Sequence, residues 1–281
     1  MSLLPAEQHV SPQRLLGWIN IPNLEFHDME KIDERRQVWV PAEEQASAEH
    51  LLQARQFREW LVSPKSTQLL IHGNYDSKRL VSGLSLFCTS FVRALQERAP
   101  RFIHLIFFCG LHVDSDVDSY VGARAMIQTF ICQLLCQFDF GSAMPSSAVS
   151  RELVQSGDVE ALCGVFLTLV HRLPRSIALI CIIDGIVYYE RPEFCDDLGV
   201  VLAAILRLSG EQSTQAAVKV LVASPIKTNE VRLPFPDELI LSMDAIARPG
   251  WVASRTRVER QLREGFQDEA GPQEELGAGD S

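Results

Sequence analysis

The sequence predicts an α/β fold in three layers, with helices on both faces of a mainly parallel five-stranded sheet, plus an N-terminal extension. Short runs that are apolar on both faces, such as TQLLIH and IALICIID, alternate with segments whose apolar residues recur at helical spacing. A strand buried on both faces belongs in a parallel sheet that helices cover on each side. With 281 residues, of which 47% are hydrophobic and 22% charged, the chain is long enough to bury such a core.

The elements follow in order along the chain. Residues 1–45 mix proline, charge and two tryptophans, and we expect an irregular extension in which 37–41 (QVWVP) suits a short strand. The domain proper is expected at 46–250, followed by a closing helix at 251–264 and a disordered acidic tail at 265–281, which is poor in bulky apolar residues. Strands are expected at 67–72, 102–109, 177–184, 217–223 and 238–243, and helices at 47–62 (capped by Ser47), 79–97, 120–138, 150–155, 159–173 and 194–209.

The overall charge excludes some functions. A formal charge of −10 and a pI near 5.2 argue against a nucleic-acid partner, which would need clustered Lys and Arg. The apolar segments are shorter than the ~20 residues that a membrane span requires, and the first ten residues show no secretory signal, so we expect a cytoplasmic protein.

The cysteines and histidines are expected to be structural. Six of the seven cysteines lie in apolar stretches and are predicted to be core thiols, because no second Cys/His pair follows at zinc-binding spacing. His72, His104 and His171 are likewise expected to be structural. The acidic run Asp114, Asp116 and Asp118 lacks the central Gly and distal Glu of a calcium loop, so a solvated loop that opens the next helix is favoured. We predict no metal site.

A candidate nucleotide site follows the first strand. In sheets of this kind, ligands bind beyond the carboxyl ends of the strands. The first strand leads into GNYDSKRLVSG, and this order of strand, Gly-led loop and helix is that of a phosphate-binding loop. Two further strands end at Asp184 and Ser224, so the candidate nucleotide-binding residues are Gly73, Asn74, Ser77, Lys78, Arg79, Asp184 and Ser224.

Three motifs in this order carry a family resemblance. The entry segment RQFREWLVSPKSTQLLIHGN, the strand IALICIIDG and the strand VKVLVASP resemble those of NACHT-type signalling NTPases of the STAND class, and most closely the fungal nephrocystin-3-like N-terminal domains. The resemblance covers about residues 46–243. It implies a P-loop NTPase fold, a site for ATP or GTP, and a switch or scaffold role that involves a protein partner.

The motifs depart from a working site. A phosphate loop reads G-x-x-x-x-G-K-[ST], in which the lysine reaches the outer phosphates and the hydroxyl binds Mg²⁺. Counting from Gly73, these last three positions are Lys78, Arg79 and Leu80; in a register one residue shorter they are Ser77, Lys78 and Arg79. Both registers lose the Mg²⁺ ligand. The acids that follow the second motif in the family align with Val187 and Tyr188, so we assign no catalytic residue.

Three functions stay open at this point. The first is a regulatory or scaffold module with weak or no nucleotide hydrolysis. The second is an active NTPase that uses Lys78, Arg79 and Asp184 in an altered arrangement. The third is an α/β protein-interaction domain without any nucleotide function.

Overall fold

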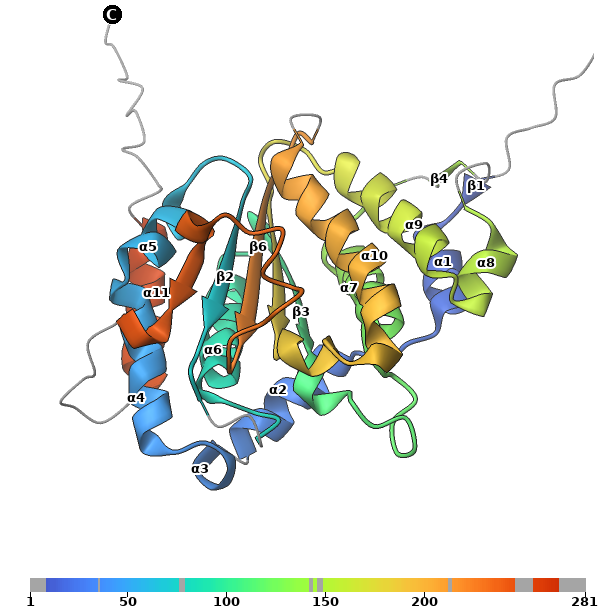
Figure 1. Ribbon diagram of the computed structural model, residues 1–281. Helices are drawn as coiled ribbons and strands as arrows, with labels where there is room; N and C mark the ends of the chain where they lie inside the picture. Colours follow the sequence, from blue (N-terminus) through green and yellow to red (C-terminus); the bar gives the residue numbers. More distant parts are fainter. Residues whose placement is uncertain are drawn as a thin grey trace, which may run out of the picture.

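The computed structural model describes residues 9–34, 36–75, 79–141, 144–145, 149–211, 214–245 and 255–267. Its centre is a five-stranded, all-parallel sheet in the order β3-β5-β6-β2-β7 (Figure 1). The predicted α/β class and all five strands are confirmed. The strands are β2 (Thr67–His72), β3 (Phe102–Phe108), β5 (Ala178–Asp184), β6 (Ala217–Ser224) and β7 (Ile240–Ser242), and a small antiparallel pair joins β1 (His9–Val10) to β4 (Met144–Pro145).

Helices cover both faces of the sheet and make the three-layer, P-loop-like arrangement that the sequence predicts (Figure 1). One face carries α6 with α4, α5 and α11, and the other carries α7, α9 and α10. The chain crosses the sheet from β2 to β3 through α6 and returns through α7, α9 and α10 on the opposite face, as right-handed crossovers require. The helices are α1 (Pro12–Ile19), α2 (Leu24–Glu34), α3 (Arg36–Trp39), α4 (Ala42–His50), α5 (Arg55–Val62), α6 (Gly83–Gln96), α7 (Gly122–Gln137), α8 (Arg151–Ser156), α9 (Val159–His171), α10 (Pro192–Gly210) and α11 (Arg255–Gln267).

The N-terminal extension is helical, which corrects the expectation of an irregular segment. Helix α1 starts after Ser11, whose side chain accepts a hydrogen bond from the backbone of Arg14, and Pro12 occupies its first turn. The segment expected as a strand places Val38 and Trp39 in the short helix α3. These helices are short, and packing on the domain stabilises them: Leu15 and Ile19 of α1 and Ile32 of α2 are buried in its cores.

The helix predicted at 47–62 is two helices. Helix α4 starts at Ala42, after Pro41 and with two glutamates in its first turn, so Ser47 lies inside the helix and does not cap it. A 3₁₀ turn (Leu51–Gln53) and the extended residue Ala54 then separate α4 from α5. The predicted closing helix exists as α11, which extends to Gln267, and the rest of the predicted tail lies outside the described residues.

Helix α2 joins the two hydrophobic cores beside the edge strand β3. Its Leu24 packs into the core under α7, whereas Met29 and Ile32 pack into the core under α6. Unpaired sheet edges invite intermolecular pairing unless something covers them, and α2 contacts β3 at this edge.

Of the six cysteines expected in the core, five are buried, but Cys136 is exposed near the end of α7.

The central strand β6 contains a buried lysine, Lys219, whose structural role was not predicted from the sequence. Lys219 is 2% exposed and points toward α5, where its ammonium group donates to the backbone oxygens of Trp60, at 2.7 Å, and Ser63. The last carbonyls of a helix have no partner within the helix, and the negative end of the helix dipole favours a cation there. The ammonium group also lies 5.8 Å from the centre of the Trp60 ring. Lys219 therefore ties α5 to the sheet.

We expect Lys219→Met to lower the free energy of unfolding by about 1–3 kcal/mol, because it leaves the α5 carbonyls without their donor. Chemical denaturation of both proteins measures the difference. Lys65→Met is the matched control: this lysine is exposed in the same region, and its replacement should change stability by less than about 0.5 kcal/mol. Equal stability of Lys219→Met and the parent protein would contradict this role.

Candidate functional site

The three strand ends predicted to form the site meet at one edge of the sheet. In the register of the strands, His72 lies opposite Ser224, and Asp184 lies opposite Ala223. The backbone N–H of Gly73 donates to the carbonyl of Ser224 at 2.8 Å, and that of Gly185 donates to the carbonyl of Ala223 at 2.9 Å. The structure thus brings Gly73, Asp184 and Ser224 together, whereas Ser77 and Lys78 lie outside the described residues.

The loop after β2 begins by folding back onto the sheet. The backbone N–H of Tyr75 donates to the carbonyl of Pro225 at 2.7 Å, and burial raises the pKa of its phenol. Asn74 has a left-handed backbone, with φ of 54°, and its side-chain amide donates to Asp244 at 2.5 Å. Both contacts fasten the loop to segments that follow β6 and β7.

The next helix starts later than the sequence analysis expects. Helix α6 begins at Gly83 instead of near Arg79, so the candidate residues Lys78 and Arg79 precede its first turn. A capping box sets this start: the Ser82 hydroxyl accepts from the backbone of Leu84, and the Ser85 hydroxyl accepts from the backbone of Ser82 at 3.0 Å. Sequence reasoning missed this signal, although S-G-L-S has the spacing of a capping pair.

The helix start puts a different triplet where a phosphate loop has Gly-Lys-Ser. Gly83, Leu84 and Ser85 occupy the opening of α6 that this motif occupies after a P-loop. Leu84 then stands in the position of the lysine, and it is fully buried in the core under α6. Ser85 keeps a hydroxyl in the Mg²⁺-binding position, but Gly83 lies ten residues after Gly73 instead of five as in the motif.

A carboxylate from the chain itself lies at the N-terminus of α6. Glu44 of α4 accepts a hydrogen bond from the backbone of Gly83 at 3.4 Å and pairs with the guanidinium of Arg79 at 3.1 Å. The Glu44 side chain is only 13% exposed. A Cβ atom at position 83 would lie 2.4 Å from the Glu44 carbonyl oxygen, so only glycine permits this approach of α4. Helix N-termini bind anions, and here the anion is internal.

The second half of the loop lies across the ends of β3 and β5. A Cβ atom at Gly110 would lie 1.9 Å from the carbonyl oxygen of Leu80, so the two backbones are in contact. The Tyr188 hydroxyl donates to the carbonyl of Arg79. Residues 79–81 therefore cover the sheet edge between the two strand ends, in place of an open cradle.

Asp184 ends β5 as a buried carboxyl group, and only 1% of its surface is exposed. Burial raises its pKa to about 7, while hydrogen bonds from the Ser85 side chain and the Gly185 backbone act in the opposite direction. Its Oδ1 atom has no hydrogen-bond partner among the described residues. With a pKa of about 7, the carboxyl group is about half protonated at pH 7 and becomes mostly protonated below it. A protonated carboxyl group is a poor ligand for Mg²⁺.

The remaining polar groups at this edge hold the loop after β6. The Ser224 hydroxyl donates to the carbonyl of Ile226 at 2.6 Å. Glu190 accepts from the backbone of Asn229 at 2.9 Å and from that of Val231 at 2.7 Å. The two acidic positions that the family resemblance places after Asp184 carry Val187 and Tyr188, and Glu190 is engaged with this loop.

Comparison with known proteins identifies the family. The family model described as nephrocystin 3, N-terminal, matches residues 46–224, which is more than half of the chain. The chain belongs to this family. The matched segment contains β2, the loop after it, α6 and Asp184, and so most of the site described above. A search of curated proteins finds no match.

The described residues at this edge fit a triphosphate poorly. Glu44 would repel a phosphate at the N-terminus of α6, and Leu84 gives it no positive charge. Within the described part of the chain, no three His, Cys, Asp or Glu side chains are grouped to hold a metal ion. No helix among the described residues could cross a membrane. The described polar groups at this edge therefore connect α4, α6 and the strand ends, and the guanidinium of Arg79 is paired with Glu44.

We expect Asp184→Asn to stabilise the protein by about 2–4 kcal/mol at pH 8. The folded-state pKa is about 7 and the ordinary value is 3.8, so folding favours the protonated acid and stability falls as pH rises between these values. The asparagine oxygen accepts the same hydrogen bonds without the cost of ionisation, and its NH2 group, placed at the unpartnered Oδ1 position, offsets part of this gain. Denaturation at pH 4 to 8 measures the effect, and Asp197→Asn, half-exposed on α10, is the control. Destabilisation of Asp184→Asn at pH 8 would show an ionised, partnered carboxylate.

We expect Glu190→Ala to loosen the loop after β6 and to lower the free energy of unfolding by about 1–3 kcal/mol, because two backbone N–H groups lose their acceptor. Tryptic cleavage after Arg232, within this loop, should become faster. Glu193→Ala is the control, since Glu193 is largely exposed and lies 4.0 Å from Arg191. Unchanged cleavage in Glu190→Ala would mean that the loop is held by other contacts.

Proposed function

We propose that this nephrocystin-3-type domain is a regulatory or scaffold module with weak or no nucleotide hydrolysis. In this proposal it is a NACHT-like member of the STAND class, as the sequence resemblance implies, and acts in the cytoplasm through a protein partner. The proposal needs no nucleic acid and no membrane.

The observation that carries the proposal is the Glu44 carboxylate at the N-terminus of α6. Phosphoryl transfer relies on positioning and on stabilising the charge of the transferred group. An internal carboxylate hydrogen-bonded to Gly83 and paired with Arg79 supplies the opposite charge at that position. Because the chain satisfies this helix terminus by itself, the domain can keep its fold without a bound phosphate.

Two further features support the proposal. Leu84 replaces the lysine that would reach the outer phosphates, and as a core residue it cannot be exchanged for a cation without a large loss of packing. Asp184, which would hold the metal through water, is buried and has a pKa of about 7. Both features support weak or no hydrolysis, because the lysine that hydrolysis uses is missing and the carboxylate is only partly ionised near pH 7, while the fold is retained.

The two other functions make different predictions. An active NTPase with an altered loop would have to use Lys78, which lies outside the described residues, and an Arg79 released from Glu44. An interaction domain without a nucleotide function would share all the features above and bind no nucleotide at all. Binding and turnover measurements separate the active NTPase from the other two.

We expect no phosphate release above the protein-free blank, and no change in melting temperature, when ATP or GTP is added with Mg²⁺. A ligand at a hundredfold excess over its Kd adds about 2.7 kcal/mol, which should raise the melting temperature by about 5–10 °C in a domain of this size. Lys78→Ala is measured in parallel. A nucleotide-dependent rise that Lys78→Ala removes, together with phosphate release that Asp184→Asn abolishes, would refute the proposal and establish the NTPase.

A further inference from the structure

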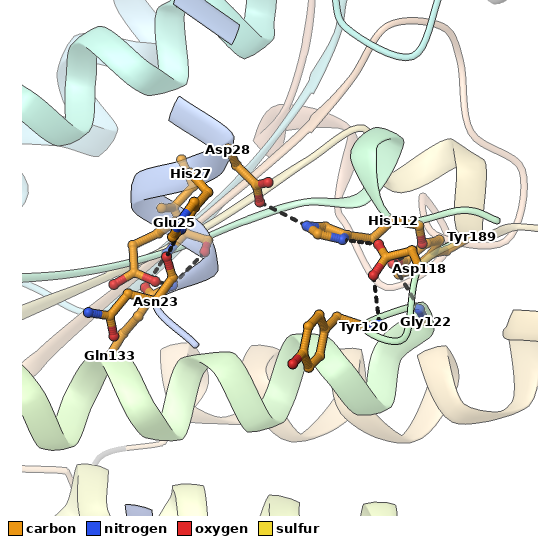
Figure 2. A network of polar contacts seen from close by, with 11 residues as sticks. Asn23, Glu25, His27, Asp28, His112, Asp118, Tyr120, Gly122, Gln133 and Tyr189 are labelled. Carbon is orange, nitrogen blue, oxygen red and sulfur yellow. Dashed lines mark hydrogen bonds and ion pairs between the residues drawn. The ribbon is translucent and has the colours of Figure 1, made fainter. Parts of the chain in front are cut away.

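A buried histidine at the end of β3 is clasped by two carboxylates from different parts of the chain (Figure 2). His112 follows the 3₁₀ turn Cys109–Leu111, and 5% of its surface is exposed. Its Nε2 lies 2.8 Å from Oδ2 of Asp28 on α2, and its Nδ1 lies 2.5 Å from Oδ2 of Asp118. The ring packs on Phe107, with 5.0 Å between the ring centres. Asp28 is 84 residues away in the sequence.

The position of His112 between two carboxylates determines which protonation states are favourable. A neutral imidazole has one N–H donor, whereas an imidazolium has two, and an ionised carboxylate can only accept. Two carboxylates can therefore both bind the ring when it is protonated, or when one carboxyl group keeps the proton. Loss of the proton leaves one ring nitrogen and one carboxylate oxygen facing each other as acceptors in a buried place, which is costly.

One side of this clasp is fixed more firmly than the other. Asp118 also accepts from the backbone of Tyr120 at 2.8 Å through its second oxygen. The Tyr189 hydroxyl donates to the carbonyl of His112 at 2.9 Å and accepts from the backbone of Gly122 at 3.0 Å. These bonds join His112 and Asp118 to the start of α7 and to the turn after β5. Asp28 is the residue through which α2 joins the clasp, so loss of its bond to His112 would loosen α2.

Helix α2 borders a cleft at the edge of the candidate site. The cleft has a volume of about 470 Å³ and is lined by Lys31, Val38 and Trp39 from α2 and α3, and on the other side by residues 79–81 with Gly110 and Leu111. Apart from the clasp, α2 is held by its apolar residues in the two cores, by an ion pair from Asp33 to Arg93 and by a 3.4 Å hydrogen bond from Gln133 to Glu25.

We propose that Asp28, His112 and Asp118 form a pH-sensitive latch that holds α2 against the sheet edge and thereby sets the width of this cleft. Protonated His112 keeps the latch closed, and its deprotonation loosens α2 while the apolar contacts keep the helix on the domain. The proposal goes beyond the proposed function and does not depend on it, since the latch would act whether or not a nucleotide binds.

The sign of the pH dependence follows from the surroundings of His112. Burial lowers the pKa of its imidazole, but the hydrogen bonds and charges of Asp28 and Asp118 together outweigh burial and raise the pKa above 6.5. A raised pKa in the folded state contributes stability that is complete below pH 6.5 and is lost as pH rises through the folded-state pKa. Burial raises the pKa of Cys109 and of Tyr189, so neither of these neighbours ionises first. Glu25 and His27 lie on α2 beside Asp28 (Figure 2).

Hydrogen exchange of α2 between pH 6 and 9, corrected for the intrinsic rate, tests the latch. Protection of residues 24–34 should fall as pH rises, by up to about tenfold for each unit by which the folded-state pKa exceeds the ordinary one, while α10 keeps its protection. In His112→Gln, α2 should have low protection at every pH. Protection of α2 that does not depend on pH, or that falls together with α10, overturns the proposal.

Two variants keep the test decisive. His104→Gln is the matched control: His104 lies on β3, the strand that precedes His112, and burial lowers its pKa to about 4, so this variant should keep the pH dependence of the parent protein. Asp118→Asn removes one of the two charges that raise the pKa of His112, and it serves if His112→Gln does not fold. In this variant the side-chain amide can donate to Nδ1 of a neutral ring while the ring Nε2–H donates to Asp28, so the fall of α2 protection with rising pH should disappear. An unchanged pH dependence in Asp118→Asn, or a lost pH dependence in His104→Gln, would overturn the latch.

Discussion

The N-terminus of α6 imposes the constraint on which this site depends. A helix that starts at the carboxyl edge of a parallel sheet presents unpaired N–H groups and the positive end of its dipole to the place where ligands bind. This chain satisfies them from within: Ser82 and Ser85 cap the helix, and Glu44 supplies the negative charge. The position of α4 follows from this arrangement, because its backbone must approach Gly83 closely enough to exclude any side chain there. The course of residues 79–81 over Gly110 follows as well, since Arg79 is held by Glu44 on one side and by Tyr188 on the other.

Asp184 is a buried carboxyl group whose surroundings determine its pKa. A carboxyl group at the end of the central strands is stabilised as an anion when a cation or several donors face it. In this chain it has the Ser85 hydroxyl and the Gly185 backbone, while one oxygen has no partner within the described structure. Burial therefore dominates and raises the pKa to about 7. The Ser82, Ser85 and Asp184 groups then form a chain of hydrogen bonds that fixes the first turn of α6 on β5. Ser85 and Asp184 thus act as structural polar contacts between α6 and β5.

The strands were predictable from the sequence, whereas the contacts that close the site were not. All five strands were found because each contains a short apolar run, and that pattern is local. The start of α6 was misplaced because the phosphate-loop pattern places the helix directly after Lys78 and Arg79 in either register, although Ser82 and Ser85 carry the capping signal. Glu44 was missed for a different reason: it lies 39 residues before its partner Gly83, and nothing local marks it. Asp118 was expected to be solvated, but one of its oxygens turns inward to His112, a residue that no pattern singled out.

The helices before residue 46 belong physically to the domain that follows them. The family match starts at Ala46, yet Glu44 completes the terminus of α6 and Asp28 completes the clasp around His112. Helix α2 also supplies Ile32, which is fully buried, to one core and Leu24 to the other. Without these helices, α6 would lose its internal anion, and the edge strand β3 and parts of both cores would face water. The extension therefore takes over two tasks, charge at the helix terminus and cover at the sheet edge, that must be met before the α/β core can be stable without a ligand.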